Sequence, residues 1–162
     1  MLAPALKRLD VHAAREEDLA AALAMVTFEQ QKNPWIERIP ELLRDAVANP
    51  KGEHRACVAI RDAELIGFGT YGIIAGSLGA GVLYSILVAP RSRRAGIGER
   101  ILVHIRSELG EAGTRVIFAE VPGDPYVMRY RALLISHGFV EETRIDDYYR
   151  DGVPQIISRL DL

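Results

Sequence analysis

The chain has 162 residues, of which 49% are hydrophobic and 26% charged, and its formal net charge is −2. This composition is typical of a globular protein, and the length suits one domain over residues 1–162. A general nucleic-acid-binding protein would be basic, and a membrane helix would need about 18 consecutive apolar residues. The sequence has neither feature, so we expect neither nucleic acid nor a membrane as a partner.

The N-terminus lacks the charged segment, apolar stretch and cleavage site of a signal peptide, so a cytoplasmic location is expected. Cys57 is the only cysteine, which excludes an intrachain disulfide. Its apolar neighbours favour a buried thiol over a nucleophile. The four histidines are scattered without metal-ligand spacing, so we expect no bound metal.

Hydrophobic periodicity predicts three elements in the first third of the chain. A short strand is expected over 9–12, and a helix over 16–27 begins with three acidic residues, which suit a helix N-terminus. A second helix is expected from about 39 to 48, with Pro40 in its first turn.

Period-two alternation then predicts a hairpin of strands 54–60 and 65–74, followed by an apolar strand over 82–88. The later elements are a helix over 97–109, a strand over 116–121, a helix over 128–136 capped by Gly138, and a closing hairpin of 143–149 and 155–159. This order predicts a mixed α+β fold and not a regular doubly wound sheet.

The segment over 88–99 reads Val-Ala-Pro-Arg-Ser-Arg-Arg-Ala-Gly-Ile-Gly-Glu and joins an apolar strand to an amphipathic helix. Glycines let the backbone approach a phosphate closely, and the unpaired N–H groups of a helix start point at it. Three arginines add positive charge where an anion would sit. The pattern indicates a pyrophosphate-binding turn; the alternative is an ordinary turn with a solvated basic loop.

Two other phosphate-binding motifs are excluded by the residues at one or two of their positions. A P-loop needs Gly-Lys-Ser/Thr, but Glu99 and Arg100 follow Gly98. A dinucleotide fingerprint needs a third glycine, and Ile101 occupies that position. What remains is Arg-x-x-Gly-x-Gly after a Val-x-Pro strand end.

With Val88-x-Pro90, Arg93-x-x-Gly96-x-Gly98 and the downstream segment 137–142, the sequence resembles the GNAT superfamily of acyltransferases over nearly its whole length. Its ribosomal-protein N-terminal acetyltransferase branch is the most similar. The resemblance implies a central, mostly antiparallel, twisted sheet that splays apart between the strands at 82–88 and 116–121. Helices would cover both faces of this sheet.

The resemblance further implies that acetyl-CoA is the co-substrate. The backbone of Ile86, Leu87 and Val88 would pair with the pantetheine arm like an additional strand. The N–H groups of the loop and helix start would hold the pyrophosphate, namely those of Arg93, Arg94, Ala95, Gly96, Ile97, Gly98 and Glu99.

Acyl transfer to an amine needs a proton acceptor, because a free alkyl amine with a pKa of about 10.4 is mostly protonated at neutral pH. Glu120 is the first candidate, since it ends the strand over 116–121 and matches a catalytic glutamate in the family branch. The alternative is a solvated strand-end carboxylate. Tyr84 is the second candidate: the period-two rule places it on the same face as Ile86 and Val88, although it could simply be packing.

The group that protonates the coenzyme thiolate is harder to assign. Many family members carry a tyrosine four residues before the Gly-Phe pair, and here Leu134 stands at that position. Tyr130 lies one helical turn earlier on a similar face and is the candidate substitute, with Tyr126 earlier still. A turn rises about 5.4 Å, so a donor that far off would need a water relay.

The segment 146–152 contains Tyr148-Tyr149 and Asp151-Gly152 and resembles a hairpin that lines the acceptor site of protein-acetylating members. A plain hairpin turn explains the same residues and is the favoured interpretation. The leading hypothesis is an N-acetyltransferase that modifies a primary amine, either a protein or peptide N-terminus or a small amine. The alternative is an acyl-CoA-binding sensor without catalysis. A homodimer is an expectation from the family.

Overall fold

The structure is a computed structural model that describes residues 8–162. In this range the chain forms the strands β1 (Asp10–Ala13), β2 (His54–Arg61), β3 (Glu64–Ile73), β4 (Ala80–Val88), β5 (Val116–Pro122), β6 (Val140–Arg150) and β7 (Val153–Asp161). The α-helices are α1 (Glu16–Gln30), α2 (Ile39–Ala48), α3 (Ile97–Glu111) and α4 (Met128–Ser136). Every helix and strand predicted from periodicity is present, with ends that move by a few residues.

Short 3-10 helices, which periodicity does not predict, begin at three prolines: Pro34–Ile36, Pro90–Ser92 and Pro125–Val127. Proline presets φ for a helical turn and needs no partner for a missing N–H. Asn33 and Asp124 precede two of them, and each side chain accepts a hydrogen bond from the backbone N–H two residues later. These segments turn the chain sharply beside the site described below.

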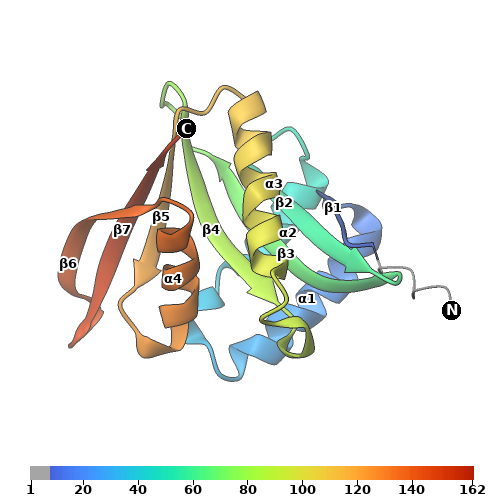
Figure 1. Cartoon of the computed structure of the whole chain (residues 1–162), viewed down its shortest axis with the longest axis horizontal. Helices are drawn as coiled ribbons and strands as arrows, with labels where there is room; N and C mark the ends of the chain where they lie inside the picture. The colour runs from blue at the N-terminus through green and yellow to red at the C-terminus, as the bar shows by residue number, and fades with distance from the viewer. Residues whose placement is uncertain (1–7) are drawn as a thin grey trace, which may run out of the picture.

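The strands form one sheet in the order β1-β2-β3-β4-β5-β7-β6. All neighbouring pairs are antiparallel except β4 and β5, which run parallel. Helices α3 and α4 cover one face of the sheet, and α1 and α2 cover the other (Figure 1). The mixed α+β fold with helices on both faces is therefore confirmed.

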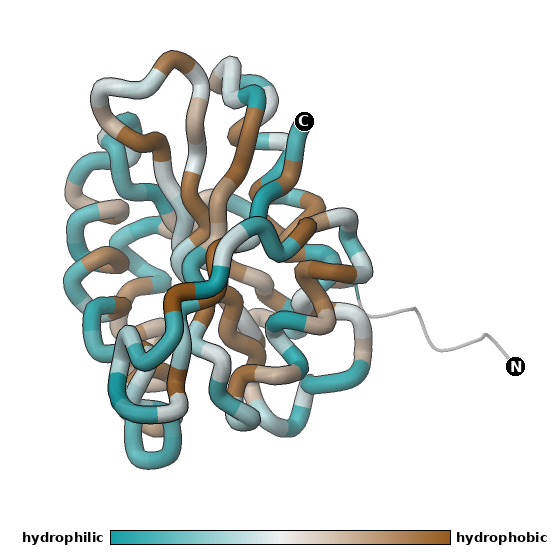
Figure 2. The backbone as a smooth tube through the Cα atoms, turned by 90° about the vertical axis from the view of Figure 1, so that its left-hand side faces the viewer, coloured by the Kyte–Doolittle hydropathy of each residue, from teal (hydrophilic) through white to brown (hydrophobic). Residues whose placement is uncertain are grey.

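Alternating side chains of the strands divide the core into two clusters. In β2, Cys57 and Ala59 pack with the α3 side, whereas Ala56 and Val58 pack with the α1–α2 side. The apolar face predicted for α3 is buried throughout, at Ile97, Ile101, Leu102, Ile105 and Leu109. Hydrophobic residues follow the strands through the middle of the molecule, and hydrophilic ones occupy the outer turns (Figure 2).

Cys57 is buried in this core, and burial raises the pKa of its thiol to about 12. Over residues 8–162, no three His, Cys, Asp or Glu side chains come together in a way that could hold a metal ion. None of the helices in that range is long and apolar enough to cross a membrane.

The predicted splay lies between β4 and β5. The two strands pair only from Ala80 with Val116 to Leu83 with Ala119. Beyond this point β4 continues to Val88 and β5 to Pro122 without pairing to each other, and the strands diverge (Figure 1). The sheet therefore has an opening in its centre, and the ends of two strands line it.

Candidate active site

Tyr84 lies where the opening begins, at an irregularity of the sheet. In the pairing of β3 with β4, Thr70 lies opposite Ser85 and the next residue, Tyr71, lies opposite Leu83. Tyr84 has no partner in β3 and is the extra residue of a β-bulge. Tyr84 packs against the core on the α1–α2 side, whereas Ile86 and Val88 pack against the α3–α4 side. The prediction that these three side chains share one face is wrong, because the bulge interrupts the strict alternation on which it depended.

The loop over 89–96, which precedes α3 and is called the anion loop below, has a backbone shape that suits a bound anion. Arg94 and Gly96 have φ values of 62° and 75°, and Gly96 is the N-cap of the helix. The first helical hydrogen bond runs from the N–H of Arg100 to the Gly96 carbonyl at 3.1 Å, so the N–H groups of Ile97, Gly98 and Glu99 precede it. Such a series of free N–H groups favours a bound anion.

Both glycines of the motif have a structural reason. A Cβ on Gly96 would meet no atom within 4 Å, so the space in front of the loop is open. A Cβ on Gly98 would lie 3.3 Å from Leu133 and 3.7 Å from Ile86, so this glycine lets α3 approach α4 and β4 closely. The positive φ of 75° is thus what favours glycine at position 96, and close packing is what favours it at position 98.

The basic residues of the loop have different partners. Arg91 forms an ion pair with Glu64, and the guanidinium of Arg93 lies 3.0 Å from the Glu29 carboxylate. Arg94 has no hydrogen bond or ion pair within residues 8–162. Arg129, which sequence reasoning missed, lies on the opposite wall and is equally unpaired in that range.

The loop opens into a groove of ≈ 570 Å³ between the start of α3, the end of β4 and the segment over 126–133. A smaller cavity of ≈ 90 Å³ lies between β4 and β5. The groove and the cavity share five lining residues, namely Asn33, Ile86, Leu87, Val127 and Tyr130. The anion loop and the opening in the sheet therefore belong to one continuous surface.

The free edge of β4 faces this groove. The N–H of Ala89 donates to Ile66 in β3 at 2.9 Å, and backbone groups alternate between the two edges of a strand. The backbone groups of Ile86 and Val88 therefore point to the open edge, and those of Leu87 point to β3. The Val88 carbonyl already accepts a hydrogen bond from Arg93 Nε at 3.0 Å.

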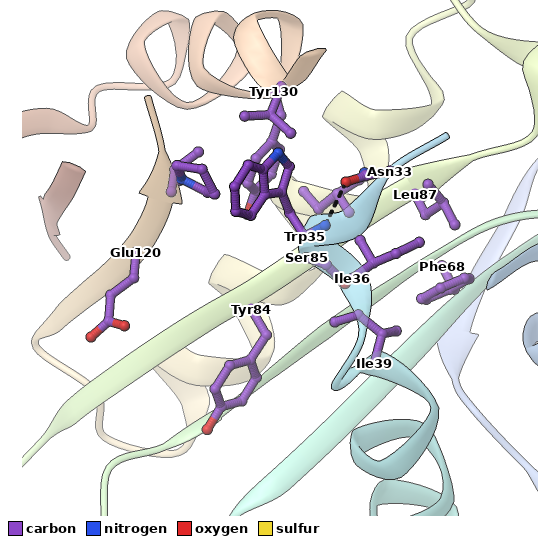
Figure 3. A pocket seen from close by; sticks show the side chains of 14 residues that line it. Asn33, Trp35, Ile36, Ile39, Phe68, Tyr84, Ser85, Leu87, Glu120 and Tyr130 are labelled. Carbon is purple, nitrogen blue, oxygen red and sulfur yellow. Dashed lines mark hydrogen bonds between the residues drawn. The ribbon is translucent and has the colours of Figure 1, made fainter. Parts of the chain in front are cut away.

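Glu120 lies on β5 just past the last residue paired with β4, and its exposed carboxylate lines the cavity. Its Oε2 accepts a hydrogen bond of 3.1 Å from Gln155 Nε2. Figure 3 shows Glu120 and Tyr84 pointing to the same end of the cavity, whereas Tyr130 enters from the opposite end. Burial raises the pKa of Tyr84; the positive charge of Arg38 opposes this, and the negative charges of Glu53 and Glu120 add to it.

Tyr130 has a buried hydroxyl without a hydrogen-bond partner within residues 8–162. It projects from α4 into both the groove and the cavity. Burial raises the pKa of this hydroxyl, so it stays protonated at neutral pH. Leu134 is buried in the core, and Tyr126 donates a hydrogen bond to Glu29 at 2.9 Å. Of these three positions, Tyr130 is the one that offers a free donor to the cavity.

Sequence reasoning also missed Trp35, which follows Pro34 in the first 3-10 helix and lines the cavity. Its buried Nε1 has no partner within the described residues. The Trp35 ring lies 5.2 Å from that of Tyr149, and the Arg150 guanidinium lies 5.6 Å from the indole centroid. The β6–β7 hairpin therefore contacts a residue that lines the cavity. A plain turn would not require this contact, and no local motif around Trp35 predicts it.

Solved structures share this fold. A GNAT-family acetyltransferase from Desulfovibrio desulfuricans is 24% identical with a TM-score of 0.84, covering 95% of this chain and 99% of its own. The ribosomal-protein-S18-alanine N-acetyltransferase of Escherichia coli is 23% identical with a TM-score of 0.74, covering 95% and 94%. A Salmonella typhimurium acetyltransferase, solved with its cofactor acetyl-CoA, is 17% identical with a TM-score of 0.79, covering 95% and 94%.

At these identities the structural likeness establishes the fold alone. A comparison with the curated proteins finds no match. The sequence itself matches the model of the Acetyltransferase (GNAT) family over residues 15–128, which is more than half of the chain and includes the anion loop, β4 and β5. The chain therefore belongs to the GNAT family of acetyltransferases.

Proposed function

We propose that the protein transfers an acetyl group from acetyl-CoA to a primary amine by direct attack of the amine on the thioester. One observation carries the proposal: the cavity between β4 and β5 joins the anion groove and has Glu120 at one end and Tyr130 at the other. A proton acceptor and a proton donor thus lie on opposite sides of the space that a thioester would occupy.

The choice of acetyl-CoA as donor is supported by the loop before α3. Free N–H groups, the open space at Gly96, and Arg94 and Arg129, which are unpaired among the described residues, suit a pyrophosphate. The free edge of β4 offers the backbone groups of Ile86 and the N–H of Val88 to an amide-containing arm, since the Val88 carbonyl already accepts from Arg93. The Salmonella typhimurium structure with acetyl-CoA has the same fold, which favours this donor.

Glu120 is proposed as the base. The incoming ammonium loses a proton to the Glu120 carboxylate, and the neutral nitrogen attacks the thioester carbonyl carbon. As the C–S bond breaks, the nitrogen loses its second proton by the same route and becomes the amide nitrogen of the product. Because Glu120 is exposed, it can pass the proton on to solvent. Tyr84 lies close enough for its pKa to respond to the charge of Glu120, and its hydroxyl is proposed to orient the amine.

Tyr130 is proposed as the donor to the departing sulfur. As the new C–N bond forms and the C–S bond breaks, negative charge collects on the coenzyme sulfur. The Tyr130 hydroxyl is protonated, buried and without a competing partner in the described structure, so it can donate to that sulfur. This role does not require the tyrosine that Leu134 replaces.

The acceptor is proposed to be a peptide N-terminus in the first place. The rings of Trp35, Tyr149 and Tyr148 contact one another in series beside the cavity and suit an extended chain, and ribosomal-protein-alanine N-acetyltransferases share the fold. An aminoglycoside 6'-N-acetyltransferase from Enterococcus faecium also shares it, with a TM-score of 0.75 and 15% identity, so small amines belong in the same screen.

A transfer assay tests the proposal by following thiol release from acetyl-CoA with peptides and small amines as acceptors. We expect at least one amine to stimulate release and to gain an acetyl group by mass spectrometry. Glu120→Gln should lose most of this activity, whereas Glu53→Gln, outside the cavity, should keep it. Binding of acetyl-CoA without transfer to any amine would favour the acyl-CoA sensor, the alternative that Leu134 raises.

A further inference from the structure

Glu29 lies near the end of α1, and its carboxylate connects three segments that are far apart in the sequence. Its side chain is only 8% exposed. Arg93 Nη2 donates to one carboxylate oxygen at 3.0 Å, and the Tyr126 hydroxyl donates to the other at 2.9 Å. We refer to Glu29, Arg93 and Tyr126 as the Glu29 clasp. It joins α1 to the anion loop and to the 3-10 helix after β5.

The clasp constrains the loop before α3. A buried carboxylate is stable only when a cation or several donors compensate its charge. Glu29 therefore needs Arg93 as its partner, and this holds the Arg93 side chain in place. Arg93 also donates to the Val88 carbonyl at 3.0 Å. The guanidinium therefore braces the loop, and the positive charge left for an anion is that of Arg94 and Arg129.

The backbone of Glu29 holds the acceptor side. Its carbonyl accepts hydrogen bonds from the N–H groups of Lys32 at 3.0 Å and Asn33 at 2.9 Å. The Asn33 side chain in turn accepts from the Trp35 N–H at 2.9 Å, the dashed line in Figure 3. Asn33 and Trp35 both line the cavity. One residue thus touches the anion loop through its side chain and sets the turn of the acceptor segment through its carbonyl.

We propose that Glu29 is a positioning residue that couples the coenzyme groove to the acceptor segment over 33–36; this inference rests on the proposed function. A ligand that fixes the anion loop fixes Arg93, hence Glu29, and hence the place of Trp35 in the cavity. Coupling between two sites is reciprocal, so an amine that fixes Trp35 also strengthens coenzyme binding.

Trp35 is the single tryptophan of the chain, so its fluorescence reports this coupling directly. Acetyl-CoA is added to the full-length protein, and emission is excited at the red edge of tryptophan absorption, where adenine does not absorb. Calorimetry under the same conditions measures coenzyme affinity separately. We expect the wild-type protein to bind acetyl-CoA with a saturable change in Trp35 emission that follows the binding curve.

Two variants weaken the clasp to different degrees. Glu29→Gln removes the charge that holds Arg93, and we expect it to bind acetyl-CoA within about tenfold of wild type while losing more than half of the emission change. Tyr126→Phe removes one hydroxyl from a half-exposed side chain and keeps its ring, and it should reduce the change by a smaller fraction. Glu64→Gln is the matched control, because Glu64 forms an exposed ion pair with Arg91 of the same loop. This control should behave as wild type.

The outcomes separate the two proposals. Glu29→Gln and Tyr126→Phe proteins that bind acetyl-CoA with the full wild-type emission change would overturn the coupling and leave the proposed function intact. If Glu64→Gln lost as much of the emission change as Glu29→Gln, the coupling would also be overturned. The loss would then follow from breaking any ion pair of the loop and not from Glu29 in particular. A wild-type protein that binds no acetyl-CoA would overturn the proposed function, and the coupling with it.

Discussion

The two walls of the candidate site are built by different means. The coenzyme wall is a continuous stretch of chain, from the end of β4 through the loop to the start of α3, and it acts mainly through backbone groups. The acceptor wall is assembled from side chains of the segment over 33–36, the end of β5 and the β6–β7 hairpin. Backbone recognition leaves a glycine pattern in the sequence, whereas side-chain assembly leaves no local pattern.

The difference has a functional consequence. A wall made of backbone can recognise the part of a substrate that is constant, which in the proposed function is the pyrophosphate of the donor. A wall made of distant side chains can change one residue at a time, and it suits the variable acceptor. The variants below are chosen to damage one wall while sparing the other.

Gly96→Glu should have the largest effect. A carboxylate about 4 Å from a bound phosphate costs about 4 kcal/mol, which is roughly a thousandfold in affinity. We expect acetyl-CoA to raise the melting temperature of the wild-type protein and not that of Gly96→Glu. Gly76→Glu is the matched control, since Gly76 has φ 77° and an equally open position far from the groove. A normal ligand-induced shift in Gly96→Glu would refute the anion site.

Glu120→Gln should damage the acceptor wall alone. Loss of a general base lowers kcat by about a hundredfold or more, while the KM for acetyl-CoA should stay within about twofold of wild type. Steady-state kinetics with the best acceptor of the screen measures both constants. An unchanged kcat would remove Glu120 from the mechanism. A rise in the KM for acetyl-CoA with constant kcat would place Glu120 on the coenzyme wall instead.

Tyr130→Phe should lower activity and raise stability together. We expect about a tenfold loss of kcat, because the departing sulfur loses a donor. Removal of a buried hydroxyl without a partner relieves about 1 kcal/mol, which corresponds to a melting temperature higher by about 2–4 °C. Tyr84→Phe serves for comparison, as its hydroxyl faces the acceptor end. A Tyr130→Phe protein with full activity would exclude this hydroxyl as the donor.

Cys57→Ala should have the smallest effect on transfer. Because the pKa of Cys57 is raised to about 12, only about one thiol in ten thousand is ionised at pH 8. We expect native protein to resist alkylation at that pH, urea-unfolded protein to react, and the variant to keep wild-type kcat. Rapid labelling of the native protein, together with loss of kcat in Cys57→Ala, would contradict the assignment of Cys57 as an unreactive core residue.

Much of the fold follows from patterns that are local in sequence. The face formed by Ile101 and Ile105, the period-two strands and the cap at Gly138, with φ 92°, all depend on neighbours within a few residues. The side of Tyr84 could not be predicted, because a single bulged residue reverses the alternation and nothing in the sequence around Leu83 announces it.

The candidate site divides in the same way. The loop at Gly96 is visible as a motif, but the commitment of Arg93 to Glu29 joins residues 64 positions apart. Only the packing of α1 against the loop reveals that this arginine braces the site. The 3-10 turn at Pro34 brings Trp35 to the cavity, and the one at Pro125 brings Arg129 to the groove. Hydrophobic periodicity does not predict how these turns change the direction of the chain.

The most direct test of the account is a calorimetric titration of the wild-type protein with acetyl-CoA. We predict one site per chain, with an affinity that weakens as salt is added, because Arg94, Arg129 and the helix start meet a charged ligand. The absence of binding at millimolar acetyl-CoA would contradict the central claim. The chain would then have the GNAT fold and its glycine loop without the coenzyme for which that loop is suited.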